Sequence, residues 1–519
     1  MHRPESARPR ASSRTARRFA LTLALPLAVF APSAYADLEK APSAKLPSAK
    51  TLATTSASAA AAPMRPRVEI ERFTLDDGLR VVLNRDVSSP TVAVVVWYDV
   101  GSRNEQPGEG GFAHLFEHIM FEGSAKYPRG VHDKIVEGRG GKLNASTSED
   151  WTRYWEMMPA GELGVTLGLE ADRMRALKID EEAFENQRKV VEEEYRMRVA
   201  NAPYVPGFFR LMELAYEGYH PYAHPAIGSM KELDDAKLEW VKAFHDGYYA
   251  PNNAVLVVSG DFEVADAKAL VHKQFDAVPR VANVKKYPDA PFAGRTKPSG
   301  PELVSDPFAR TPMTAYAWSI PKSGEADHYA LQLAAAILSD GESSRLQRTL
   351  VKDLAVAQSV SAGTEDHRGP DAFVLEAHLA EKGKLDDVEK RLLAAIDELG
   401  KKAPTEAEMK KSRAQIEHGL LFGLQSNLSR ALTLATFEGE RGDANLLTTE
   451  VDRYLAVTPE QVRAAVAKYL GADRVAHVRV MPPVSDKGDG GKGDKTSDKS
   501  DKTEAPKPPK AAPKKEAGK

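Results

Sequence analysis

The hydrophobic and β-branched residues near the start of the chain predict a series of strands and helices. A similar series is predicted later in the chain. Residues 79–83 and 91–100 are β-branched runs, which are typical of strands. Residues 314–320 form a comparable run, and residues 329–338 follow it with helical periodicity. These patterns predict strands near the start of two separate parts of the chain.

The ends of these two parts also correspond. Residues 240–249 have a helical pattern and residues 254–259 a strand pattern. Residues 459–469 and 475–480 repeat this pair in the same order. We therefore predict an α+β fold of two homologous halves, joined around residues 288–301.

Composition divides the chain further. Residues 1–36 are predicted to be a signal peptide, and residues 37–66, rich in Ala, Ser, Pro and Lys, a disordered linker. Residues 485–519 contain Lys, Asp and Pro with hardly an apolar side chain, so a disordered tail is expected. Between them we predict two homologous domains, an N-terminal one at 67–290 and a C-terminal one at 300–484.

The first residues predict export. Arginines precede an apolar run at residues 19–31, which is short for a membrane span of about 20 residues. Ala34 and Ala36 offer the small residues that a signal peptidase reads, which places the cleavage before Asp37. We expect an exported protein, either periplasmic, in the cell envelope or secreted. The alternative is an uncleaved signal segment, which would be the chain's contact with the membrane.

Overall composition excludes several classes of function. The 519 residues contain no cysteine, so disulfides, thiol nucleophiles and thiolate metal sites are excluded. A formal net charge of −3 gives no reason to expect a nucleic acid as partner. Any bound metal must therefore be held by nitrogen and oxygen atoms.

One motif has the spacing of a metal site. His114 and His118 are four residues apart, with Glu117 between them, in the pattern H-x-x-E-H. Residues three and four apart are neighbours on a helix, so the three side chains share one face. The core-facing stripe of this helix is predicted from its apolar side chains: Phe112, Leu115, Phe116, Ile119 and Met120. Two imidazoles one turn apart can bind one zinc ion, with the carboxylate beside it.

Two histidines four apart can also arise by chance, as two surface residues. His220 and His224 are such a pair, but Pro221 and Pro225 stand within or beside it and no carboxylate lies between them. This second pair is predicted to lie in a loop without a metal. The full five-residue pattern on an amphipathic helix favours the metal interpretation for the first pair.

A catalytic zinc ion needs a third protein ligand and an open position for water. The helix predicted at residues 181–199 offers three consecutive glutamates, and its apolar stripe places Glu194 inward and turns Glu192 and Glu193 away. An inward carboxylate is costly unless a cation pairs with it. The candidate cation is the metal, and the alternative is a salt bridge to an arginine.

These residues resemble the pitrilysin family of zinc peptidases, which includes insulin-degrading enzyme and the mitochondrial processing peptidase. In that family the third ligand is a Glu about 76 residues beyond the second His, and here 194 − 118 = 76. Further segments are similar to the family's bacterial members: 141–147, 187–191, 201–204, 220–222 and 249–253. The resemblance spans about residues 68–480 and is specific in the first half.

The resemblance implies two homologous halves, each a mostly antiparallel sheet flanked by helices, that form one lobe of a clamshell. It implies one zinc ion per chain, held by His114, His118 and Glu194, with Glu117 as the general base on a zinc-bound water. It also implies that a peptide binds as an added β-strand beside an edge strand at Asn144, Ala145 and Ser146. The expected substrates are peptides or unfolded protein segments.

Two departures from the family pattern concern the surroundings of the site. Many relatives carry a Glu where this chain has Gln187, which can support the ligands by hydrogen bonds without holding their charge. The arginine and tyrosine that hold the substrate carbonyl in relatives align with Val351 and Gln358. We therefore expect a dimer, in which a paralogous chain could supply the missing pair.

Two other functions fit parts of the sequence. The chain could be a non-catalytic binding or scaffold subunit of a two-chain peptidase, although such subunits usually lose part of H-x-x-E-H. It could also be a structural envelope protein with a stabilising zinc ion. Structural sites usually have four protein ligands, and no fourth is suggested by the spacing. A zinc endopeptidase is therefore the predicted function.

Overall fold

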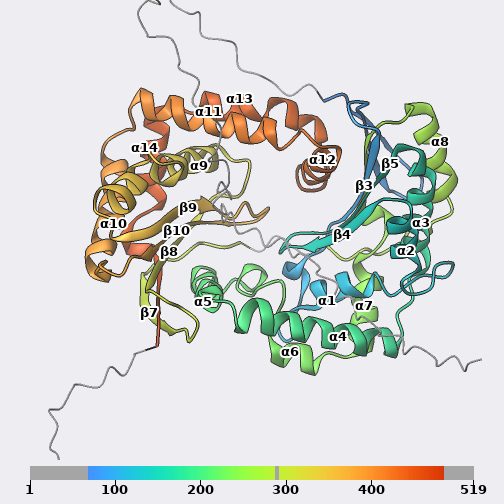
Figure 1. The fold of residues 1–519 in the computed structure, drawn as a ribbon, viewed down its shortest axis with the longest axis horizontal. Coiled ribbons are helices and arrows are strands. Elements are labelled where there is room, and N and C mark those ends of the chain that lie inside the picture. The colour runs from blue at the N-terminus through green and yellow to red at the C-terminus, as the bar shows by residue number, and fades with distance from the viewer. Residues whose placement is uncertain (1–67, 287–290, 484–519) are drawn as a thin grey trace, which may run out of the picture. The chain divides into compact units, whose positions relative to one another are not determined.

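The computed structural model describes residues 68–286 and 291–483. The predicted signal peptide, linker and tail lie outside these residues. Within them, every helix is too short or too polar to span a bilayer. The described chain forms two mixed sheets with helices on their faces (Figure 1), which confirms the predicted α+β fold of two similar halves.

The first sheet contains six strands among the described residues, in the order β1-β2-β6-β3-β5-β4. Their bounds are β1 (Glu71–Thr74), β2 (Arg80–Arg85), β3 (Thr91–Tyr98), β4 (Lys142–Thr147), β5 (Thr152–Pro159) and β6 (Ala254–Gly260). All neighbouring pairs are antiparallel except β2 and β6, which run parallel. β4 therefore lies at the edge of the sheet, as predicted for the segment around Asn144.

The second sheet has the same design with five described strands, in the order β7-β11-β8-β10-β9. The strands are β7 (Ser299–Ser305), β8 (Met313–Ile320), β9 (Ala357–Thr364), β10 (Asp371–Leu379) and β11 (Ala476–Met481). Again one pair, β7 and β11, is parallel and the others are antiparallel. The two sheets correspond strand by strand, with β4 in the place of β9, and β1 is an addition to the first.

Each half contributes its own set of helices, most of which lie with the sheet of that half. In the first half they are α1 (Phe112–Ile119), α2 (Val131–Gly138), α3 (Leu163–Ala176), α4 (Glu181–Tyr195), α5 (Val205–Ala215), α6 (Met230–Asp235), α7 (Leu238–Tyr248) and α8 (Val264–Phe275). In the second they are α9 (Ala326–Ser339), α10 (Leu385–Lys401), α11 (Glu406–Phe422), α12 (Asn427–Arg441), α13 (Glu450–Ala456) and α14 (Pro459–Tyr469). The elements predicted from periodicity are all present, with ends that differ by a few residues.

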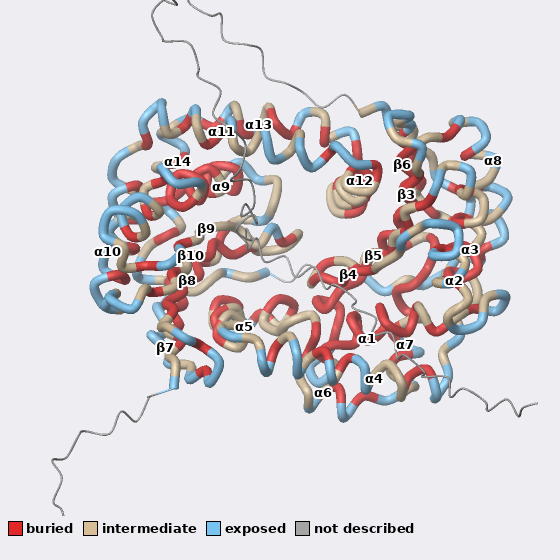
Figure 2. Tube along the Cα trace, in the orientation of Figure 1, coloured by how far each residue is buried: buried red, intermediate tan, exposed pale blue. Residues whose placement is uncertain are grey.

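Both faces of each sheet are buried, because the halves exchange one helix each. Strand β3 directs Val94 and Val96 toward the helices of its own half and Val95 and Trp97 toward the other face. On that other face packs α12, which comes from the second half (Figure 1). In the same way α5, from the first half, packs on β8 and β11 of the second sheet. The central strands of both sheets are accordingly buried along their length (Figure 2).

Candidate metal centre

The motif H-x-x-E-H lies on α1, a helix of eight residues. Gly111 begins it with φ of 93°, a left-handed conformation that glycine adopts without a steric penalty. The apolar side chains of α1 pack in the core of the first half, as their spacing predicts. His114, Glu117 and His118 are nevertheless buried as well, with exposures of 0%, 0% and 4%. Three buried ionisable groups on one short helix need partners from elsewhere.

Helix α4 supplies the nearest partner. Its N-cap Asp180 accepts a hydrogen bond from the backbone of Ala183, which is a favourable start for a helix. Near its other end the side chain of Glu194 is 7% exposed, whereas that of Glu193 is 62% exposed. The inward orientation expected for Glu194 is therefore present, and this carboxylate meets the two histidines.

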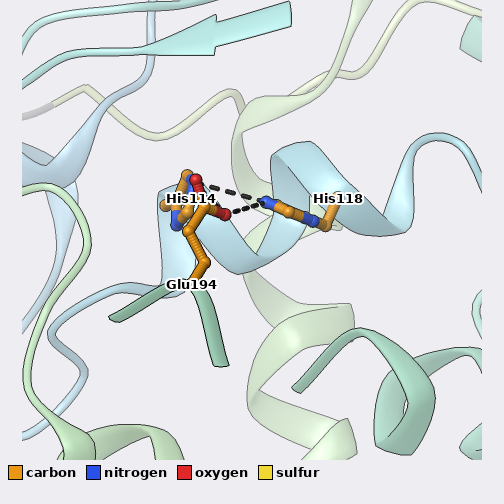
Figure 3. A group of neighbouring side chains, drawn as sticks. All are labelled: His114, His118 and Glu194. Carbon is orange, nitrogen blue, oxygen red and sulfur yellow. Dashed lines mark hydrogen bonds and ion pairs between the residues drawn. The ribbon is translucent and has the colours of Figure 1, made fainter. Parts of the chain in front are cut away.

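The three side chains converge on one point (Figure 3). Nε2 of His114 lies 3.3 Å from Nε2 of His118. Oε2 of Glu194 lies 3.3 Å from Nε2 of His118 and 3.8 Å from Nε2 of His114. Nitrogen and oxygen ligands about 2.0–2.2 Å from a tetrahedral zinc ion lie about 3.4 Å from one another. The observed spacing and the two-nitrogen, one-oxygen donor set thus fit a zinc site with one position left for water or substrate.

Electrostatics around the cluster agree with this fit. Burial, and secondly the neighbouring His118, holds the pKa of His114 well below its usual range, so its imidazole is neutral and can bind a metal. The second carboxylate oxygen of Glu194 lies 3.1 Å from Nη1 of Arg198. The salt bridge that was the alternative to a metal ligand is therefore present too, on the oxygen that faces away from the histidines.

Glu117 does not join the three converging ligands. Its Oε2 accepts a hydrogen bond of 2.5 Å from the hydroxyl of Thr147, at the end of the edge strand β4. Its Oε1 is buried and has no hydrogen-bond partner within the described residues. Burial raises the pKa of Glu117 to about 7, against the lowering effects of His118 and of the Thr147 hydroxyl. A carboxylate with a pKa near neutrality is suited to accept and return a proton.

The predicted peptide-binding residues lie on β4 beside α1. Ala145 packs into the core of the first half, and Ser146 accepts a hydrogen bond of 3.0 Å from Nε of Arg153 on β5. Asn144 is half-buried on the same face of the strand as Ser146. Among the described strands β4 pairs with β5 only, so its outer edge is not covered by another strand.

Three further residues are those that the resemblance marks as departures from the family pattern. Gln187 donates a hydrogen bond from Nε2 to Glu122 and does not contact the converging ligands. In the second half, Val351 packs half-buried against the core, and Gln358 is exposed, with Nε2 3.4 Å from Oγ1 of Thr311. Neither Val351 nor Gln358 carries the charge or the hydroxyl of the pair that relatives use.

A cavity that is open to solvent lies next to this centre. Thr147 and Arg198, which contact Glu117 and Glu194, are part of its wall, and Phe208 and Met212 of α5 form an apolar side. The contact of Thr147 with Glu117 and the cavity were not predicted from the sequence. The alternation of side chains along an edge strand is the signal that could have indicated Thr147, because every second residue of β4 faces α1.

Two other groups of ligand-type side chains differ from the first. His132 and two glutamates cluster near α2, but Arg173 already neutralises that group through Glu170. In the second half His328 donates to Asp371, with Nε2 and Oδ2 2.8 Å apart. In each of these groups a hydrogen bond or an ion pair already engages the histidine or a carboxylate. Among the described residues, Nε2 of His114, Nε2 of His118 and the inner oxygen of Glu194 pair only with one another.

Comparison with known proteins gives a consistent result. Residues 80–217 match the family described as Insulinase (Peptidase family M16), and residues 235–416 match the Peptidase M16 inactive domain. Zinc protease PqqE of Helicobacter pylori is 32% identical over 360 residues, which cover 69% of this chain and 80% of that protein.

Solved structures have the same fold. The crystal structure of a protease from Helicobacter pylori is similar with a TM-score of 0.74 and 28% identity, covering 80% of this chain and 100% of that one. The periplasmic protease PqqL from Escherichia coli has a TM-score of 0.66 and 16% identity, and the match covers 80% of this chain and 48% of that one. At this lower identity the likeness concerns the fold alone.

Proposed function

The chain belongs to the M16 (insulinase) peptidase family, and from this premise we propose that it is an exported zinc-dependent endopeptidase that hydrolyses peptides or unfolded protein segments. The observation that carries the proposal is the convergence of His114, His118 and Glu194, three buried groups with zinc-ligand spacing, beside Glu117. One zinc ion per chain is proposed at this point.

Glu117 is the proposed general base. Bound zinc would supply Lewis acidity for the substrate carbonyl and lower the pKa of a water molecule. Thr147 holds Oε2 of Glu117 in a hydrogen bond, and Oε1 has no partner within the described part of the chain. In the proposed reaction this free oxygen takes the proton of the attacking water and then gives it to the leaving amine.

The edge strand β4 is the proposed binding site for the peptide. Every second residue of an antiparallel strand turns its backbone N–H and C=O to the outer side, so the segment of Asn144, Ala145 and Ser146 can pair with an extended chain. Main-chain hydrogen bonds do not depend on the side chains of the substrate, so cleavage at many sequences is expected. The apolar wall of the neighbouring cavity, with Phe208 and Met212, favours an apolar substrate side chain.

The chain is proposed to work as a dimer, and a paralogous chain would complete the site. The tetrahedral oxyanion needs a donor beyond the metal, and Val351 and Gln358 stand where relatives have the arginine and tyrosine that supply it. Export to the periplasm or the cell envelope is proposed from the pattern of residues 1–36, and the domain limits 67–290 and 300–484 from the repeated patterns.

Hydrolysis of a quenched peptide library by the purified mature chain tests this function. The chain is assayed alone and with its candidate paralogue, beside Glu117→Gln, whose zinc content is measured. We expect cleavage that needs the paralogue and disappears in Glu117→Gln with zinc retained. Full activity from the chain alone would keep the peptidase and contradict the obligate partner.

The second candidate is a non-catalytic binding subunit of a two-chain peptidase. The match of residues 235–416 to an inactive domain and the Val351 and Gln358 substitutions favour it. Peptide binding without any cleavage that depends on Glu117, under both conditions of the same assay, would select this candidate.

A further inference from the structure

The N-terminus of the zinc-binding helix α1 is anchored by a carboxylate from outside the helix. Gly111, at the N-cap, has no side chain that could cap the first turn. Glu105 takes this role: its Oε2 accepts from the backbone of Gly111 at 3.0 Å and its Oε1 from that of Ala113 at 2.7 Å. Glu105 is completely buried. A buried carboxylate at a helix N-terminus is favourable for the helix dipole but needs a countercharge.

His224 is that countercharge. Its Nε2 lies 3.0 Å from Oε2 of Glu105 and 3.1 Å from the carbonyl oxygen of Ser102. Its Nδ1 lies 2.8 Å from the carbonyl oxygen of His220. Both ring nitrogens therefore face only acceptors, an arrangement that suits a doubly protonated imidazolium. Burial lowers the pKa of His224, but the hydrogen bond and the charge of Glu105 outweigh it and raise the pKa to about 9.

The segment that carries His224 also fits closely around the start of α1. The backbone of Gly110 donates to Glu232 at 3.2 Å. A Cβ at Gly228 would lie 2.2 Å from the carbonyl oxygen of Gly110, and one at Gly111 would lie 2.7 Å from that of Ile227. The approach is close enough that movement of the 220–232 segment would displace the first turn of α1.

His114 lies in that first turn, as the third residue of α1, next to the Ala113 amide that Glu105 holds. Histidine ligands usually have their other ring nitrogen fixed by a hydrogen bond. Nδ1 of His114 is buried and has no such partner within the residues that the structure describes. The orientation of this imidazole therefore depends on where the helix itself is held.

We propose that Glu105 and His224 form a positioning pair that holds α1, and with it the imidazole of His114, in the geometry needed to bind zinc. The pair rests on the proposed zinc site. It gives a role to His224, one member of the second H-x-x-x-H pair, which binds no metal in this interpretation. Neither side chain forms a hydrogen bond or an ion pair with the three converging side chains, so both act through the helix.

The test measures the Zn²⁺ affinity of the full chain, by competition with a chromophoric chelator, in His224→Gln and Glu105→Gln. His328→Gln is the matched control, because it also removes a buried histidine–carboxylate pair but lies on α9 of the second half. The unfolding temperature of each metal-free protein is recorded beside the affinity. Removal of groups that support metal ligands typically weakens affinity about 10- to 100-fold, and we expect this loss in both variants. His328→Gln should lower the unfolding temperature and leave the affinity unchanged.

Unchanged Zn²⁺ affinity in His224→Gln would overturn the positioning role, and so would an equal loss in His328→Gln. If Glu105→Gln does not fold, His224→Gln decides alone, since it keeps the contacts of Glu105 with α1. A wild-type chain that binds no Zn²⁺ would overturn the proposed function together with the pair. A wild-type chain that binds Zn²⁺ as tightly as its variants do would overturn the pair only.

Discussion

The two halves of the molecule share a strand order but differ in the helix that carries the chemistry. Helices α1 and α9 each have a histidine at the third position, His114 and His328. Three and four residues later α1 has Glu117 and His118, whereas α9 has Leu331 and Gln332. Two positions of the proposed metal centre in the first half are thus occupied by an apolar and a neutral residue in the second.

The contacts of these helices also correspond. Thr147, the last residue of β4, donates to Glu117 of α1, and Thr364, the last residue of β9, accepts from Gln332 of α9 at 3.3 Å. The second half therefore keeps the hydroxyl, but its partner Gln332 is neutral and stands at the position of His118, while Leu331 stands at the position of Glu117. A repeated fold brings corresponding side chains together in both halves. A few substitutions at these positions then decide whether the cluster can bind a metal.

Substitution of a candidate metal ligand should give the largest difference in zinc content and activity between the two halves. His118→Ala leaves two of the three converging groups, so we expect near-complete loss of bound zinc and a fall in peptide hydrolysis of about 10³-fold or more. Metal analysis after dialysis and the peptide assay measure both effects. The same analysis on His328→Gln should give a wild-type zinc content, and a fall there would contradict the assignment of the metal to the first half.

Substitution of the threonine at the end of β4 or β9 should give the second largest difference between the two halves, in kcat. Thr147→Val removes the hydrogen bond that orients Glu117, and we expect kcat to fall about 10- to 100-fold with KM and zinc content retained. Thr147→Ser keeps a hydroxyl and should restore most of the rate. Thr364→Val is the matched change in the second half, and a comparable loss of kcat from it would show that strand-end hydroxyls act through stability alone.

Much of the fold and part of the site could be predicted from the sequence. The order of strands and helices follows from periodicity, and the zinc cluster from the spacing within α1 and the inward face of α4. The packing of α5 on the second sheet and of α12 on the first could not be predicted. The amphipathic pattern of a helix does not indicate which sheet its apolar face will contact. The roles of Thr147 and His224 depend on contacts between segments 30 and 119 residues apart, at Glu117 and Glu105.

Substitutions in α5 and α12 test how much the packing of each helix on the sheet of the other half contributes to the free energy of unfolding. Gly439 of α12 lies against Trp97 of β3, where an added Cβ would be 2.6 Å from the indole ring. Gly207 of α5 lies against Val480 of β11, where a Cβ would be 2.2 Å from Cγ2 and 3.6 Å from Cβ. We expect Gly439→Ala to cost about 2–3 kcal/mol in the free energy of unfolding and Gly207→Ala about 1 kcal/mol.

The difference follows from the neighbour. Three atoms of a fully buried ring would clash at Gly439, whereas one methyl group would clash at Gly207. Denaturant unfolding of the metal-free chain, followed by circular dichroism, measures both costs. A larger cost for Gly207→Ala would mean that the α5 contact, and not the α12 contact, is the more rigid of the two.

The smallest expected difference between the halves concerns how pH changes the free energy of unfolding. Burial alone raises the pKa of Glu389, but hydrogen bonds from His477, Arg479 and Thr314 outweigh it and hold the pKa at about 2. In the first half, burial raises the pKa of Glu170 to about 8, with Glu156 adding to the rise and Arg173 opposing it. An unfolded chain returns both groups to an ordinary value of 4.5.

The two shifts act in opposite directions. The stability from Glu389 is present above about pH 4.5 and is lost as the pH falls toward about 2, because the unfolded state takes up the proton first. The stability from Glu170 is present below about pH 4.5 and is lost as the pH rises through about 8, because the folded state releases its proton last. Glu389→Gln should therefore flatten the decline of the unfolding temperature on the acid side, and Glu170→Gln the decline on the alkaline side. A change on the alkaline side in Glu389→Gln, or on the acid side in Glu170→Gln, would contradict the direction of the corresponding pKa shift.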